Sequence, residues 1–377
     1  MCIRDSWSLL AQLTDSLGKP LSVSDVLDHA EPTIARQYAT QPNVRATMQS
    51  ALGEIYLSNG DQARAELLLR EAVASEREYG RDSADLATRL ETLGRLLLGL
   101  QQYAGAESTG TEARAIRAKI TPGIISEEAT KTLGSALMGT EKYAEAEQLF
   151  RELVAAQRKQ SKESMSTSAL ILLGEDLRRQ GRNEEASAVF REELARVQSK
   201  PGVDSAGLAS VYSYLGATQL MMGHGQLADS LMRLAYDLYG SVTPVRYQRV
   251  GRGTMLANRA ELAARAGDDA TAAPLADSAR AMWKEVLPRG DARWAALARV
   301  DALLLRDHHQ PAAAVGRLVA MLDTLRSKPH PNLYTYRRTE AALAEVYDRW
   351  GQPDSAAAHR ALARPGAPLS VTTLAQQ

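Results

Sequence analysis

Histidine and carboxylate pairs are the first residues whose types could do chemistry in this sequence. His308 and His309 are adjacent, but neighbouring residues of a helix point about 100° apart, so the pair would not chelate one metal ion from a helix. We therefore predict that both lie in a turn before Pro311 and have no metal-binding role. Glu127 and Glu128 are typical of the charged first turn of a helix, which the helix dipole favours, rather than of a catalytic carboxylate pair.

The local motifs that mark common active sites do not occur in the sequence. It has no Gly-x-Ser-x-Gly, no His-Glu-x-x-His and no phosphate-binding Gly-x-x-x-x-Gly-Lys-Ser/Thr. The single cysteine, Cys2, excludes an intrachain disulfide and a cysteine-based zinc site. Arg289-Gly290-Asp291 fits the end of one helix and the cap of the next. We therefore predict no catalytic residue, no cofactor and no metal ion, and a chain that is not an enzyme.

Arginine and glutamate side chains are the remaining candidates, and their distribution along the chain is uneven. There are 45 basic and 45 acidic residues, a balance that argues against a broad nucleic-acid or anionic-membrane surface. Residues 1–199 hold 24 basic and 29 acidic side chains, net −5, whereas residues 200–377 hold 21 and 16, net +5. The C-terminal part therefore offers guanidinium groups suited to a peptide carboxylate or to acidic side chains.

A repeat of about 40 residues must position these side chains. Five Leu-Gly pairs recur with gaps of 41, 40, 40 and 42 residues, and an alanine follows each glycine by twelve residues. The glycines are Gly53, Gly94, Gly134, Gly174 and Gly216, and the alanines are Ala65, Ala106, Ala146, Ala186 and Ala228. The period continues as Ala260 with Ala272, Ala302 with Ala314 and Ala344 with Ala356, which makes eight units between about residues 44 and 364. Small residues let two antiparallel helices cross closely, so each unit is predicted to be a helix hairpin.

Turn signals and periodicity agree with an all-α chain. Glycine stands beside Asp or Asn between the two helices of a unit, as in Asn59-Gly60-Asp61 and Gly267-Asp268. Glycine can end the first helix in the left-handed conformation, and the acidic residue can cap the second. Ala65, Leu68 and Ala72 show the helical period that follows such a turn. No segment alternates with period two for long enough to predict a strand, and no apolar run approaches the ~18–20 residues that span a bilayer.

These residues resemble the tetratricopeptide-repeat family. Its consensus is matched by Leu52-Gly53 with Tyr56, Ala65 and Ala72, by Ala146 with Phe150, and by Ala186 with Phe190. The long spacing is similar to the kinesin-light-chain variant of the repeat, and Lys328-Pro329-His330-Pro331 resembles its linker. Gly110, however, stands where an aromatic residue is expected, and units six and seven lack the Leu-Gly pair. The resemblance implies a right-handed superhelical solenoid of about eight helix-turn-helix repeats, acting as a non-enzymatic protein-protein interaction scaffold.

In such a superhelix the first helix of each hairpin, helix A, lines a concave groove. We predict that the groove residues not used in packing bind the partner. They are Glu54, Glu91, Arg95, Lys131, Glu175, Arg178, Arg179, Tyr214, Asn258, Arg265, Arg299 and Arg306. For any one of them the alternative is a merely solvated face. Glu175 and Glu261 lie among the arginines, so the predicted wall is mixed and would prefer a patterned acidic peptide to a polyanion.

The segment from Gly240 to Gly253 interrupts the period, because the turn glycines Gly223 and Gly267 lie 44 residues apart. It carries Arg246, Arg249 and Arg252 around Tyr247. Two interpretations stay open, a partner-binding loop and an ordinary longer connection.

The two ends of the sequence differ from the repeats. Residues 1–6 resemble a non-native leader, so we expect the natural protein to extend upstream. Residues 7–43 are predicted to be a linker with a packing helix over 24–40, residues 44–364 the solenoid, and residues 365–377 a disordered tail. Roughly the first 60 residues also resemble the junction that precedes a C-terminal repeat array in bacterial Ser/Thr protein kinases, although the kinase motifs themselves are absent.

That second resemblance implies an alternative function, the sensory or regulatory region of a truncated, membrane-tethered kinase; an enzyme built on the repeats ranks last. In either of the first two cases we expect a protein or peptide partner, no nucleic acid, no membrane contact by this part of the chain, and a monomer. The location follows the choice between them: cytoplasmic, or extracytoplasmic if the chain belongs to a membrane-anchored kinase.

Overall fold

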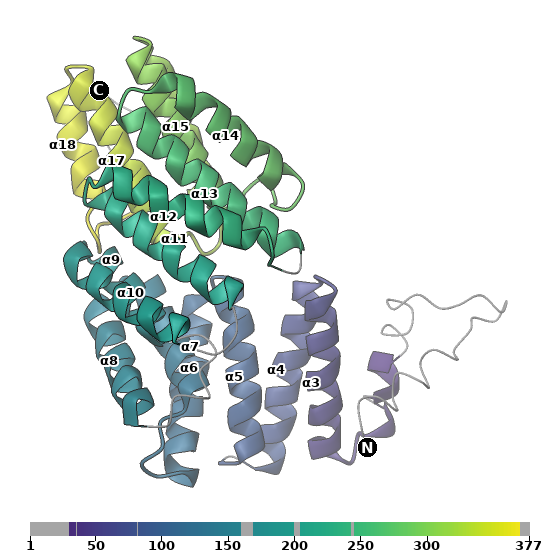
Figure 1. Ribbon diagram of the computed structural model, residues 1–377. Coiled ribbons are helices and arrows are strands. Elements are labelled where there is room, and N and C mark those ends of the chain that lie inside the picture. Colours follow the sequence, from purple (N-terminus) through teal and green to yellow (C-terminus); the bar gives the residue numbers. More distant parts are fainter. Residues whose placement is uncertain are drawn as a thin grey trace. The chain divides into compact units, whose positions relative to one another are not determined.

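The protein is described here by a computed structural model, which covers residues 30–34, 36–80, 82–159, 169–199, 204–242 and 245–369. Every regular element over these residues is an α-helix (Figure 1). The chain divides into two compact units, unit 1 (residues 1–133) and unit 2 (residues 134–377). In the described parts of the chain, no helix has the length and apolar character needed to cross a membrane.

The helices follow one another as pairs, as the repeat predicted. Unit 1 holds α3 (Pro42–Ser58) with α4 (Gln62–Tyr79) and α5 (Ala84–Gly99) with α6 (Tyr103–Ile120), and α7 (Glu127–Gly139) contains the boundary between the units. Unit 2 continues with α8 (Tyr143–Lys159), α9 (Ala169–Arg179), α10 (Asn183–Gln198), α11 (Ser205–Met221), α12 (Gly225–Tyr239), α13 (Val245–Arg265), α14 (Asp269–Lys284), α15 (Trp294–Asp307), α16 (Pro311–Arg326), α17 (Leu333–Arg349) and α18 (Pro353–Leu362). The predicted all-α repeat fold is confirmed.

Close packing inside the hairpins follows from the glycine of helix A. The alanines twelve residues after each glycine are fully buried, as predicted. The side chain that lies on the glycine, however, comes four residues later, and a Cβ on Gly134 or Gly174 would stand 2.5 Å from the ring of Phe150 or Phe190. The same offset places Leu69 on Gly53 and Met232 on Gly216. The space that each glycine leaves on helix A is therefore filled by a large side chain from the second helix of the hairpin.

The second hairpin, α5 with α6, departs from this arrangement in a way that explains its sequence. The position that is aromatic in the third and fourth repeats is Gly110 in this one, and a Cβ on it would lie 2.9 Å from the backbone nitrogen of Leu133. The neighbouring helix α7 thus occupies the space, and its Thr132 lies against Gly94. Glycine at this position, in place of the aromatic residue of the consensus, therefore lets α6 approach the next hairpin closely.

The predicted turns are confirmed by backbone geometry. Gly60 and Gly267 have φ of +86° and +76°, in the left-handed region where glycine is unstrained. Asp61 and Asp268 cap α4 and α14, each accepting a hydrogen bond from a backbone N–H of the first turn. The pair at 308–309 lies in the turn between α15 and α16, as predicted.

The two interpretations of Gly240–Gly253 as a loop or long connection are wrong. Helix α13 begins at Val245 and carries Arg246, Arg249 and Arg252. Two glycines of this segment are packing positions, because Gly251 lies under the ring of Tyr239 and Gly253 under that of Trp283. A single helix of 21 residues accounts for the longer period.

Two other boundaries differ from the sequence prediction. Helix α14 ends at Lys284, so Gly290 does not terminate it, and Asp291 accepts a hydrogen bond from the N–H of Arg293 just before α15. Residues 1–29, which include the predicted leader and the start of the helix predicted over 24–40, lie outside the described part of the chain; residues 30–34 are helical. At the other end, residues 370–377 also lie outside, whereas Leu369 packs against the hydrophobic cluster of α15 to α17.

Candidate binding groove

Three of the four predicted groove residues of unit 1 form ion pairs with neighbouring side chains. Glu54 is exposed on α3. Glu91, on α5, is buried and accepts hydrogen bonds from the guanidinium of Arg117 at 2.8 and 3.1 Å. Arg95 and Lys131 both face Glu128, at 3.7 and 3.1 Å. Glu91 and Arg95 therefore connect α5 to α6 and to α7, whereas Lys131 pairs within α7.

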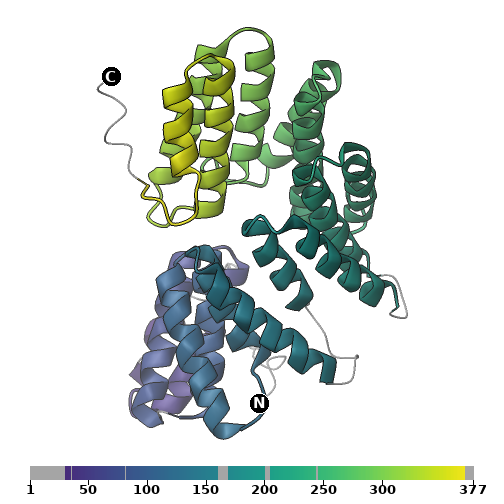
Figure 2. The ribbon, with the colours of Figure 1, turned by 90° about the vertical axis from the view of Figure 1, so that its left-hand side faces the viewer.

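The A helices of unit 2 bring their inner side chains together. Helix α9 contacts α11, α11 contacts α13, α13 contacts α15, and α15 contacts α17, in addition to the contacts within each hairpin. Figure 2 shows these pairs following one another from α9, in teal, to α18, in yellow. Side chains that leave the same side of successive A helices consequently face one inner surface, which we call the unit 2 groove.

Glu175, on α9, is the first charged centre of the unit 2 groove. Its carboxylate accepts hydrogen bonds from Arg178 at 2.9 Å and from Arg179 at 2.9 Å. Both guanidinium carbons lie 5.0 Å from the ring centroid of Tyr334, on α17, and Arg178 also donates to the Tyr334 hydroxyl. Burial opposes ionisation of Glu175, but the two arginines outweigh it and hold its pKa below the ordinary value.

Glu261, on α13, is the second centre and is more completely buried, with 1% of its side chain exposed. It accepts hydrogen bonds from Arg299 of α15 at 3.1 Å, from Arg338 of α17 at 3.1 Å, and from Arg265 of its own helix at 3.3 Å. Burial would raise the pKa of Glu261, but the three guanidinium groups outweigh it and lower that pKa strongly. One carboxylate thus holds three arginines from three helices.

A cavity opens beside the second centre. It is lined by the polar residues Thr254, Asn258, Arg293, Arg299, Tyr334, Thr335 and Arg338 and by the apolar residues Ala257, Trp283, Ala292 and Ala296. Trp283 is held in place by a hydrogen bond from its indole N–H to the carbonyl of Val250 and by edge contact with Trp294. The cavity therefore offers guanidinium donors beside a tryptophan that is itself buried in the core.

The remaining predicted residues of unit 2 occupy other places. Tyr214, on α11, stacks on Phe190 with ring centroids 5.2 Å apart, and burial raises its pKa to about 12. Arg306 donates twice to Asp307, in a separate pocket that Arg349 and Trp350 also line. Arg265 and Arg299 both donate to Glu261 and Asn258 lines the cavity beside Arg299, whereas Arg306 lies outside this cluster.

Sequence reasoning missed Tyr334 and Arg338, which link the two centres. Both lie in the first half of α17, ten and six residues before Ala344, whereas the predicted set was counted close to each small residue. An aromatic residue followed by Arg337-Arg338 at the start of an A helix was the available signal. Arg337 makes a different contact, donating to Glu141 at 3.1 Å from both Nε and Nη2.

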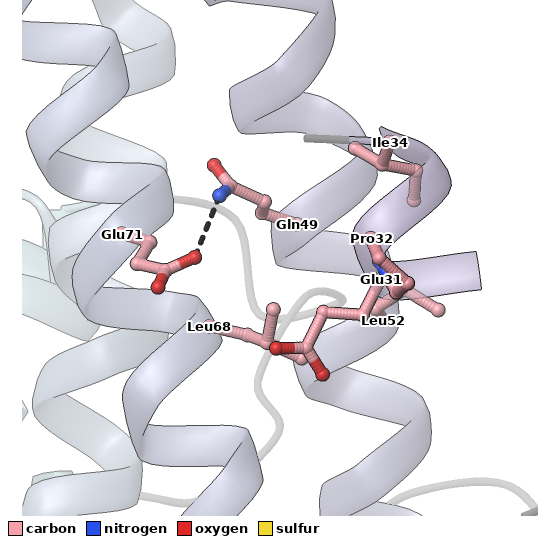
Figure 3. A pocket seen from close by; sticks show the side chains of 7 residues that line it. All are labelled: Glu31, Pro32, Ile34, Gln49, Leu52, Leu68 and Glu71. Carbon is pink, nitrogen blue, oxygen red and sulfur yellow. Dashed lines mark hydrogen bonds between the residues drawn. The ribbon is translucent and has the colours of Figure 1, made fainter. Parts of the chain in front are cut away.

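A smaller pocket lies in unit 1 between the N-terminal helical segment and the hairpin α3–α4 (Figure 3). Glu31, Pro32 and Ile34 form one side of it, and Gln49 donates to Glu71 across the other at 2.8 Å. None of the predicted binding residues lines it. Across the described ranges, no group of His, Cys, Asp and Glu is arranged to hold a metal ion.

The comparisons with known proteins agree with this fold. Residues 45–85 and residues 164–241 each match a profile of the tetratricopeptide repeat. The chain therefore carries tetratricopeptide repeats, as its spacing indicated. A comparison with curated proteins finds no match.

Solved structures with the same architecture cover most of the chain. The apo form of the quorum sensor NprR from B. thuringiensis is 13% identical, with a TM-score of 0.61 over 95% of this chain and 96% of that one. The Rap conjugation gene regulator of plasmid pLS20, in complex with the Phr* peptide, is 15% identical, with a TM-score of 0.59 over 89% and 92%. A tetratricopeptide repeat protein from Parabacteroides merdae ATCC 43184 is 17% identical, with a TM-score of 0.51 over 73% and 92%. At these identities the likeness shows the fold.

Proposed function

We propose that this chain is a non-enzymatic protein-interaction module and that the groove of unit 2 binds an extended peptide or a segment of a partner protein. The observation that carries the proposal is the convergence of Glu175, Glu261, Tyr334 and their five arginines on one inner surface beside a cavity. Polar side chains from α9, α13, α15 and α17 meet there although they are distant in sequence. A solenoid with such a surface suits a ligand that runs across several repeats.

The chemistry of the surface supports a peptide in particular. Guanidinium groups and the Tyr334 hydroxyl can donate to peptide carbonyls and carboxylates, and Asn258 can both donate and accept. Two proteins of similar fold support the same inference, because the Rap regulator of pLS20 was solved with the Phr* peptide and a Rap protein was solved with the Competence and Sporulation Factor.

Site-specific photo-crosslinking tests the proposal. A photoreactive amino acid replaces Asn258 in the groove, and a control chain carries it at Ser230, which lies exposed on α12. Both chains are irradiated with a random heptapeptide mixture and the adducts are identified by mass spectrometry. We expect adducts at position 258 and few at position 230. Equal labelling at both positions, or labelling at 230 alone, would rule out this groove as the binding surface.

The kinase-linked alternative remains a prediction of the sequence. No contact in the structure favours it over a free-standing module, so the test is genetic. Sequencing of the genomic region upstream of Met1 should reveal a kinase domain and a membrane segment if that interpretation is right.

A further inference from the structure

The first and the last hairpin of unit 2 meet at a buried ion pair. Glu141 lies in the turn between α7 and α8, and Arg337 lies on α17. Arg337 donates to Glu141 from both Nε and Nη2 at 3.1 Å, and the two side chains are 8% and 5% exposed. The pair joins residues that are 196 positions apart. Since neighbouring hairpins of unit 2 also contact one another, this pair closes the unit into a ring.

The C-terminal strap, residues 363–369, is bonded to the same two side chains. The backbone N–H of Gly366 donates to Glu141 at 2.7 Å, and Arg337 donates to the carbonyls of Leu362 and Ala367. Leu369 packs on the hydrophobic cluster of α15 to α17. Five hydrogen bonds therefore join the α7–α8 turn, α17 and the strap at one place.

The backbone of Glu141 indicates that its side chain has a role beyond the turn. Each of the eight hairpin turns holds one residue in the left-handed conformation, and in five of them that residue is glycine. Glu141, with φ of +64°, is an exception, as are Gln101 and His309. A side chain is strained in this conformation, whereas glycine is not. The turn by itself would therefore favour glycine at position 141, and the bonds of the carboxylate offset the strain.

We propose that Glu141, Arg337 and the strap form a releasable clasp, which holds unit 2 closed and lets its first and last hairpins separate when it opens. A repeat array depends on contacts between neighbouring hairpins, so the clasp can break while each hairpin stays folded. The attraction within a buried ion pair is largely offset by the loss of hydration, so such a pair selects one arrangement more than it stabilises it. The contact of Arg178 with Tyr334, between α9 and α17, also spans the ring and would break with the clasp.

The proposal concerns the chain alone, so its tests need no ligand. Their failure would leave the proposed peptide binding standing, and a failure of peptide binding would leave the clasp standing.

Hydrogen exchange of the full chain, followed by mass spectrometry, tests whether Glu141 holds the strap. Glu141→Gly removes the carboxylate and relieves the turn, whereas the matched control Gln101→Gly relieves the same backbone strain in a turn of unit 1. We expect the strap amides to exchange at least about tenfold faster in Glu141→Gly, the scale of one lost charge-assisted hydrogen bond, and at the wild-type rate in Gln101→Gly. Amides of α14 should exchange at the same rate in all three chains. Unchanged exchange of the strap in Glu141→Gly would overturn the clasp.

Melting temperatures of the same variants should change in opposite directions. Gln101→Gly should melt at a higher temperature than the wild type, because it only relieves strain. Glu141→Gly should melt at a lower temperature, because it also leaves the Arg337 guanidinium without its carboxylate. An equal rise for both variants would show that the Glu141 side chain holds nothing, and would overturn the proposal.

A distance measurement tests whether the ring itself opens. Spin labels are attached to Glu145→Cys on α8 and Ala357→Cys on α18, two exposed positions, in a Cys2→Ser chain, and their separation is measured by double electron–electron resonance. Arg337→Met removes every bond that this side chain donates and leaves Glu141 buried without its cation. We expect one narrow distance distribution for the wild type and a longer, broader one for Arg337→Met, with unchanged helix content by circular dichroism.

Arg317→Met, at an exposed position of α16, is the control and should keep the wild-type distribution. Should Arg337→Met not fold, Glu141→Gly with the same labels gives the same test. An unchanged distribution in the folded variant would overturn the opening of the ring.

Discussion

Asp176 offers a sharp test of the electrostatics inside unit 2. It lies on α9 with no exposed surface. One carboxyl oxygen accepts a hydrogen bond from Gln180 at 2.7 Å, and the other, Oδ1, is buried without a partner. Burial raises the pKa of Asp176 from 3.8 to about 7, with a further rise from the charges of Glu147 and Glu175. At pH 8 the folded protein therefore carries an ionised carboxylate that its surroundings disfavour.

The sign of the effect follows from the two pKa values. Below pH 3.8 the carboxyl group is protonated in both the folded and the unfolded chain, so it has no effect on stability. Between pH 3.8 and about 7 the unfolded chain loses the proton first, so stability falls as the pH rises, and above about 7 the loss is complete. A shift of this size corresponds to at most about 4 kcal/mol. Asp176→Asn keeps the acceptor for Gln180 and removes the ionisation.

Urea denaturation of the wild type and of Asp176→Asn at about pH 4.5, 6 and 8, values that span the two pKa values of Asp176, measures the difference in their free energies of unfolding. We expect Asp176→Asn to be more stable than the wild type by an amount that grows with pH and reaches about 2–4 kcal/mol at pH 8. Asp237→Asn, at an exposed position of α12, is the control and should show little change at any pH. The reasoning is refuted if the gain for Asp176→Asn at pH 8 is no larger than at pH 4.5.

Three further predictions concern other contacts. Glu261→Gln should destabilise the protein by about 3–5 kcal/mol at pH 7 in urea denaturation, because it leaves three guanidinium groups without their central carboxylate. The control Glu54→Gln, at an exposed position, should change stability by less than about 0.5 kcal/mol. Because the folded protein lowers the pKa of Glu261, the stabilisation by its carboxylate should be complete above the usual pKa of a glutamate and be lost as the pH falls through the lowered pKa. Gly134→Ala should lower the free energy of unfolding by about 1–3 kcal/mol, because the new Cβ would lie 2.5 Å from Phe150. Gly316→Ala, where no atom lies within 4 Å of the new Cβ, should raise the free energy of unfolding by about 0.5–1 kcal/mol. Unchanged stability for Gly134→Ala would mean that the α7–α8 contact is misplaced. Arg265→Gln should weaken peptide binding by about tenfold in fluorescence anisotropy, whereas Arg233→Gln on α12 should not; equal effects would place the peptide elsewhere.

The hairpins were predictable because their signals are local and repeated. Each glycine or alanine with an alanine twelve residues later marks one helix crossing, and glycine with an aspartate marks the turn, so eight weak signals reinforce one another. The residue that packs on each glycine, for example Phe150 on Gly134, could also have been predicted from this pattern, because it lies at a fixed spacing from the glycine. The prediction of a loop over residues 240–253 rested on the 44-residue spacing of the turn glycines, and a longer helix produces the same spacing as a longer loop.

The sequence by itself determined the secondary structure, the period and the set of A-helix residues from which a groove could be built, since these depend on residues less than one repeat apart. The tertiary structure alone decided which charges meet. Arg338 reaches Glu261 across 77 residues, and Arg178 reaches Tyr334 across 156. Such pairings depend on the total rotation between the hairpins that carry the paired residues. Many small packing contacts contribute to that rotation, so no single sequence motif predicts it. For the same reason the unpaired Nε of Arg299 becomes visible only in the folded unit 2.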